Sequence, residues 1–192
     1  MAFIRNFLAL IGLVSIIFVG LVAFQAKEKF KYFDEGAAHD YLKMASIFME
    51  TNYIAESMVW KVPVEEGVTP EDFETSILAV AADRNLAITG VFPLGEDIRL
   101  KTDKPYRYVK IFTFCRSRVA ADMLDYSDAY SSFMPCRIAL IEDKQGKYWL
   151  YSMDMDPMIY GGAPLPPKLK KDALEIRDIM IEMMQKGAAG DF

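Results

Sequence analysis

Sulfur-bearing side chains are the residues of this sequence that point most directly to a chemistry. Met153, Met155 and Met158 stand close together in the stretch SMDMDPMIYGGAPLPP. Thioether sulfurs are soft ligands that select Cu(I), and a cysteine sulfur can serve as a fourth ligand. The spacing therefore supports a copper site built from these three methionines and one cysteine.

The same stretch also fits a purely structural role. Met153 and Met155 lie two residues apart, on one face of an expected strand end, and Asp156-Pro157 breaks that strand. Gly161-Gly162 is typical of a turn, and the prolines that follow suit the start of a helix. Because the chain has 12 methionines, most are expected to fill the core. We favour this structural interpretation, expect no cofactor, and keep copper as the second interpretation.

The two cysteines are the other candidates for chemistry. Cys115 ends one expected strand and Cys136 begins another, so they can be neighbours in an antiparallel sheet. Three interpretations stay open: two small buried side chains, a disulfide or redox pair, and a single reactive thiol at Cys136. Arg116 and Arg137 adjoin the sulfurs in sequence and would lower a thiol pKa, but adjacent residues on a strand point to opposite faces.

The remaining sequence does not provide the parts of the common enzyme classes. The only histidine, His39, precedes the expected domain, so a Ser-His-Asp or Cys-His pair inside the domain is excluded. There is no phosphate-binding glycine motif and no histidine cluster for zinc. Asp143, Asp154 and Asp156 stand near expected turns, where aspartate commonly bonds the local backbone. These observations favour a non-catalytic protein.

Charge excludes a nucleic-acid partner and suggests a lipid one. The net charge is −5 and the pI is about 5.0. The only basic clusters are KEKFK and the KLKK of residues 168–171, too small for a nucleic-acid footprint. The lysines of KEKFK directly follow an apolar segment, so we expect them to contact lipid headgroups.

That apolar segment predicts a membrane anchor. The stretch NFLALIGLVSIIFVGLVAFQA, from Asn6 to Ala26, carries no charge. About 20 such residues, as a helix, span the roughly 30 Å hydrocarbon core of a bilayer. A signal peptide is the alternative, but its apolar region is shorter, and bulky Phe24 spoils the AFQA cleavage site. We therefore expect a tail at residues 1–5 and a transmembrane helix at 6–26.

The orientation of this anchor is predicted from two opposing arguments. Arg5 and the amino terminus lie on one side, against Lys27, Lys29 and Lys31 on the other, which disfavours export of the domain. A short tail before a first apolar segment is nevertheless the usual arrangement of an exported, tethered domain. We expect a single-pass protein of the bacterial inner membrane with its soluble domain in the periplasm.

Residues 27–57 should form a juxtamembrane linker and an amphipathic helix. Within residues 38–58, apolar side chains cover more than half the girth of the expected helix. Such a helix is normally buried, either against its own domain, which we favour, or against a partner subunit. The candidate partner contacts are Tyr41, Met44, Phe48, Met49 and Tyr53.

Residues 58–192 are predicted to fold as one α+β domain. Alternating or apolar runs indicate strands near residues 60, 90, 110, 140 and 150, the last two forming a hairpin around DKQG. Helical spacing predicts helices after Thr69, over 118–124 and over 166–186, the last ending at Gly187. Strands joined mainly by hairpins and short helices favour a mostly antiparallel sheet with helices packed on one face.

Three stretches of this region resemble the bacterial family named domain of unknown function 302. They are FTFCRSRVAADML, FMPCRIALIEDKQGKYWLYSMDMD and the C-terminal run from YGGAPLPP onward, and the tetrapeptide Met134–Arg137 is the most specific. The resemblance covers about residues 58–192 and implies an architecture similar to that of the TATA-binding protein. It implies no activity, and it does not extend to the anchor or the helix after it.

The sequence thus predicts a membrane-tethered, non-catalytic accessory protein, a subunit of or satellite to a bacterial inner-membrane complex. The alternative is a periplasmic thiol, redox or Cu(I)-handling protein that uses Cys136, Cys115 and the turn from Met153 to Met158.

Overall fold

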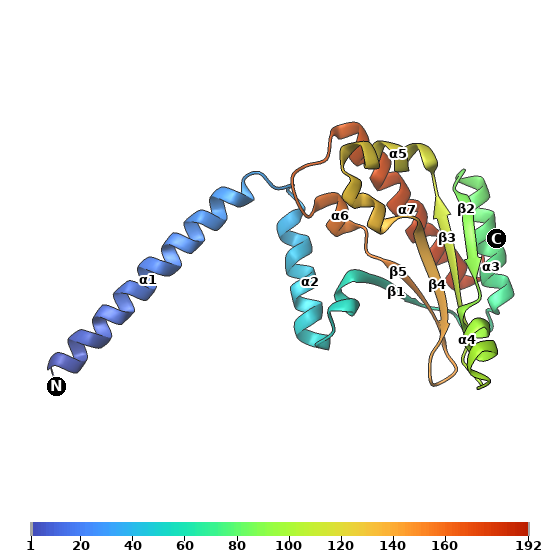
Figure 1. Cartoon of the computed structure of the whole chain (residues 1–192), viewed down its shortest axis with the longest axis horizontal. Coiled ribbons are helices and arrows are strands. Elements are labelled where there is room, and N and C mark those ends of the chain that lie inside the picture. Colours follow the sequence, from blue (N-terminus) through green and yellow to red (C-terminus); the bar gives the residue numbers. More distant parts are fainter. Residues whose placement is uncertain (1, 192) are drawn as a thin grey trace.

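The computed structural model describes residues 2–191, in which one long helix stands apart from a compact α+β domain (Figure 1). Helix α1 (Ala2–Phe30) projects away from the rest of the chain, and its side chains from Phe3 to Lys27 are all exposed. It is long and apolar enough to cross a membrane. Lys27 and Lys29 lie in its last turn, where cations favour the negative end of the helix dipole.

A five-stranded antiparallel sheet forms the centre of the domain and confirms the predicted fold class. The strands follow the order β1-β5-β4-β3-β2. Their bounds are β1 (Val59–Pro63), β2 (Ala87–Phe92), β3 (Val109–Cys115), β4 (Cys136–Glu142) and β5 (Tyr148–Met153). The predicted hairpin joins β4 to β5, and Asp143 closes it by accepting from the backbone N–H groups of Gln145 (2.8 Å) and Lys147 (2.9 Å).

Two helices, α3 (Pro70–Asp83) and α7 (Pro167–Ala189), cover one face of the sheet (Figure 1). Alternation along the strands turns every second side chain toward them. The fully buried side chains of this core include Phe73, Ile77, Phe112, Ile138, Leu140, Leu150, Met180 and Met183. Helix α3 begins with a capping box, in which the Thr69 hydroxyl and the Asp72 carboxylate each accept from the other residue's backbone N–H.

The helix predicted over residues 38–58 is two elements. Helix α2 (Ala37–Thr51) is capped by Asn52, whose left-handed conformation (φ 61°) turns the chain. The short 3₁₀ helix η1 (Ile54–Met58) then leads into β1. Three further short elements are α5 (Ser117–Tyr126), η2 (Asp128–Phe133) and α6 (Asp156–Tyr160).

The end of α7 and the presence of α4 differ from prediction, and in both places a glycine allows close packing. Helix α7 passes through Gly187 and ends at Ala189, with Gly190 at φ 69° as its cap. A Cβ at Gly187 would lie 2.8 Å from the Phe73 ring, so this glycine allows α7 to approach α3. Helix α4 (Leu94–Thr102) was not predicted, and it packs through Gly95, where a Cβ would lie 2.5 Å from the Arg107 carbonyl oxygen.

Candidate functional site

The joint between α1 and α2 is fastened to the domain by polar contacts. The backbone N–H of Asp34 donates to the Gly162 carbonyl at 2.8 Å, and the Asp34 carboxylate pairs with Lys170 of α7. Gly36 lies against the ring of Tyr160, which a Cβ at this position would approach to 2.8 Å. The predicted Gly161-Gly162 turn therefore also binds the segment that leads into α2.

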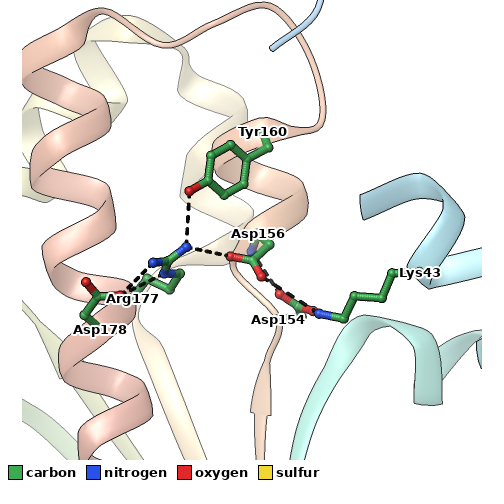
Figure 2. A network of polar contacts seen from close by, with 6 residues as sticks. All are labelled: Lys43, Asp154, Asp156, Tyr160, Arg177 and Asp178. Carbon is green, nitrogen blue, oxygen red and sulfur yellow. Dashed lines mark hydrogen bonds and ion pairs between the residues drawn. The ribbon is translucent and has the colours of Figure 1, made fainter. Parts of the chain in front are cut away.

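A chain of charged groups continues this attachment from α2 to α7 (Figure 2). Lys43 of α2 donates to the buried carboxylate of Asp154 at 2.6 Å and lies 3.8 Å from that of Asp156. Arg177 of α7 donates to the other Asp156 oxygen at 3.1 Å. Partial burial works to lower the pKa of Lys43, but its hydrogen bond with Asp154 and the nearby carboxylates raise that pKa overall. The network therefore keeps Lys43 charged and α2 in place.

Asp40 lies on the same side of α2 and is the unusual member of this region. It is 5% exposed, and its Oδ2 has no hydrogen-bond partner among residues 2–191. Burial raises the pKa of this carboxyl, and the negative charges of Asp156 and Asp154 raise it further, against the smaller effects of Lys43 and His39. Asp40 therefore opposes the attachment when it is ionised.

The opposite side of α2 leaves apolar side chains in solvent. Tyr41, Leu42, Phe48 and Met49 follow the spacing i, i+1, i+7 and i+8, which places them on one side of a helix. Leu42 is 72% exposed and Met49 is 76% exposed, and Tyr53, just after the helix, is 70% exposed. We define these five residues as the α2 apolar surface.

Packing of this helix against its own domain, the interpretation favoured from sequence, holds for only one side of α2. Within α2 only Ala37 and Asp40 are buried, and Met44 is half-buried. The hydroxyl of Tyr41 donates to the Gly161 carbonyl, but its ring remains 43% exposed. The helix is held by charges and hydrogen bonds, which an apolar periodicity cannot reveal. The five predicted partner contacts stay a prediction, and Leu42 joins them.

The sulfur residues gather elsewhere, around a cavity of about 60 Å³ between the sheet end, α5 and α6. Two of the three methionines in the copper hypothesis, Met155 and Met158, line it together with Cys115 and Cys136. Met153 is not part of its wall; it is a neighbour of Ser152, which faces the core, so it points to the other face of β5. Two methionines that sequence reasoning missed, Met123 and Met134, complete the sulfur lining.

The two cysteines are free thiols at the adjoining ends of β3 and β4. Cys136 pairs with Phe114, the residue before Cys115. Burial raises the pKa of the Cys136 thiol to about 11, and the neighbouring Cys115 contributes in the same direction. A reactive thiol needs the opposite shift, so these surroundings do not favour that interpretation.

The adjacent arginines do not change this picture. Arg116 donates to the Glu175 carboxylate at 2.6 Å and to the Arg84 carbonyl at 2.6 Å, so its guanidinium is already engaged. Arg137 is exposed, next to Cys136 along the strand. Its lowering effect on the Cys136 pKa is the smallest of the contributions.

Comparison with known proteins places the domain in a family but assigns no activity. The sequence pattern of the family described as "Domain of unknown function DUF302" matches residues 60–187. The fold is similar to the crystal structure of the uncharacterized conserved protein DUF302 from Bacillus stearothermophilus, with a TM-score of 0.54 and 16% sequence identity, covering 67% of this chain and 97% of that chain. None of the curated proteins matches this sequence. Helices α1 and α2 lie outside the matched residues.

Proposed function

We propose that this chain, which belongs to the DUF302 family, is a membrane-anchored interaction protein rather than an enzyme. Helix α1 is the anchor, and the α2 apolar surface binds a subunit of a membrane complex. The observation that carries this proposal is that a helix joined to the domain by hydrogen bonds and ion pairs leaves Leu42 72% exposed and Met49 76% exposed. Exposed apolar groups that follow one side of a fixed helix are typical of an interface.

The attachment of α2 also favours binding energetically. Apolar area removed from water contributes about 25 cal/mol per Å². A flexible helix would lose much of that gain on becoming ordered, whereas the contacts of Lys43 and Asp34 hold α2 in one place before a partner arrives. The polar contacts on one side of α2 thus fix the position of the apolar side chains on its other side.

The location of the α2 apolar surface suggests the kind of partner. Only a short connection separates α1 from α2, so an inserted α1 keeps α2 next to the bilayer surface. Lys27, Lys29 and Lys31 then lie at the headgroups, where anionic lipids attract them. A partner at this height is itself a membrane protein, and we place the complex in the bacterial inner membrane with the domain on the periplasmic side.

The test is purification of the full-length protein from its native membrane in mild detergent, with identification of every chain that co-elutes. The variant Leu42→Glu places a charge in the α2 apolar surface. Leu100→Glu in α4 is its matched control, because Leu100 is 74% exposed against 72% for Leu42. We expect Leu42→Glu to lose stoichiometric partners while remaining in the membrane, and Leu100→Glu to retain them.

Two results would contradict this proposal. One is a wild-type protein that elutes alone at low salt. The other is equal loss of partners in both variants, which would separate the interaction from α2. Accessibility of an introduced cysteine at Ser132, tested with a membrane-impermeant reagent on intact cells with permeabilised outer membranes, checks the periplasmic orientation; labelling only after lysis would reverse it.

A further inference from the structure

The cavity between the sheet end, α5 and α6 is lined by six sulfur-containing residues from separate parts of the chain. Cys115 ends β3, Cys136 begins β4, and Met123 belongs to α5. The other three sulfur residues, Met134, Met155 and Met158, come from the segment before β4 and from the turn and helix after β5. Such a convergence of thiols and thioethers is independent of the α2 apolar surface.

The chemistry of this wall selects one class of ligand. None of the described residues that line the cavity carries a carboxylate or an imidazole. Hard cations such as Mg²⁺ and Ca²⁺ require oxygen ligands and therefore have no partners here. Thiolate and thioether sulfurs are the ligands of Cu(I), and the carbon-rich remainder of the wall, including Phe114, Val119 and Ile176, excludes water.

We propose that this cavity binds one Cu(I) ion through the thiolate of Cys136 together with the thioethers of Met155 and Met158. Met123 and Met134 complete the soft surroundings. Binding exchanges a thiol proton for the metal: the S–H bond breaks, a Cu–S bond forms, and the proton passes to solvent. One thiolate balances the single charge of Cu(I), which suits an apolar site because a neutral unit costs less to bury than a net charge.

The arrangement of neighbouring groups agrees with a neutral site. Arg116 also lines the cavity, but its bond of 2.6 Å to the Glu175 carboxylate offsets its positive charge. Helix η2 forms the outer wall through Tyr130 and Phe133 and contains no buried residue, so the route to solvent is short.

The experiment is an anaerobic titration of the full-length protein in detergent micelles with Cu(I) bound to bicinchoninic acid, whose colour reports the metal that the protein removes. We expect one Cu(I) per chain and only sulfur neighbours in the copper X-ray absorption spectrum. Cys136→Ser should weaken binding by more than about 100-fold, since even the loss of groups that merely orient ligands weakens metal binding by about 10- to 100-fold.

Methionine variants provide the matched control and guard against misfolding. The double variant Met155→Leu/Met158→Leu conserves side-chain volume while it removes two of the proposed ligands, and it should weaken binding by at least about 10-fold. Met153→Leu removes a methionine two residues from Met155 whose side chain lies outside the cavity. Its affinity should equal that of the wild type.

Several outcomes would overturn the proposal. They are a wild-type protein that takes no copper from the chelator, binding that survives both Cys136→Ser and the double methionine variant, and a loss in Met153→Leu as large as in the double variant. Retained partners with no copper binding would overturn this inference alone. Copper binding without partners would overturn only the proposed interaction role.

Discussion

Helices α7 and α2 are both partly apolar, yet the domain holds them in different ways. Helix α7 buries nine residues, among them Met180, Met183 and Met184, against α3 and the sheet. Helix α2 buries only Ala37 and Asp40 and is attached through Lys43 and its neighbours. The difference shows that apolar periodicity in this chain marks two kinds of helix surface. One kind is buried in the core, and the other stays exposed to solvent.

The largest expected difference in stability is between two variants in which one methionine, on α7 or on α2, is replaced by alanine. Met183→Ala removes a fully buried side chain from α7 and should lower the free energy of unfolding of the domain by about 2–5 kcal/mol. Met49→Ala on α2, at 76% exposure, should change it by no more than about 0.5 kcal/mol. Thermal or urea unfolding of both variants in micelles measures the contrast. Equal effects would show that α2 packs as α7 does.

A smaller effect is expected from Lys43→Ala. The change leaves the Asp154 carboxylate, 3% exposed, without its charged partner, and an unpaired buried acceptor costs about 1–3 kcal/mol. We expect faster amide hydrogen exchange in α2 and unchanged exchange in α7. Lys43→Arg retains the charge and should preserve most of the protection. Uniform acceleration in both helices would mean that the network stabilises the whole domain rather than the attachment.

The smallest effect is a pH dependence at Asp40. Its pKa in the folded protein is raised above the ordinary value of 3.8, mainly by burial and then by Asp156 and Asp154. The protonated carboxyl therefore favours the attachment fully below that ordinary value, and the benefit is lost as the pH rises through the folded-state pKa. Protection of α2 amides, corrected for intrinsic exchange, should fall as the pH rises from the ordinary value of 3.8 through the raised folded-state pKa of Asp40.

The variant Asp40→Asn separates this group from the other carboxylates. It keeps the size of the side chain and removes its charge, so it should protect α2 more than the wild type does near neutral pH and flatten the fall. A fall of the same size in the variant would assign the pH dependence to Lys43, His39 or the aspartates that face them, and not to Asp40.

Local patterns were sufficient for most of the domain. The strands were predicted from alternation and the start of α3 from Thr69 and Asp72, because neighbouring residues decide these features. Helix α4 could not be predicted from apolar spacing, because it packs through backbone contact at Gly95 and not through an apolar stripe. The end of α7 was misplaced for a related reason, since Gly187 is a contact with Phe73 and not a cap.

The sequence by itself determined that this protein has an apolar N-terminal helix, an α+β domain of the DUF302 family and a surplus of sulfur. Tertiary structure alone decided which methionines line one cavity, because its wall joins Met123 and Met134 to Met155 and Met158, which are far apart along the chain. It also decided which side of α2 faces solvent. The physical reason is the same in both cases: charges and voids depend on distances in space, and periodicity records only distances along the chain.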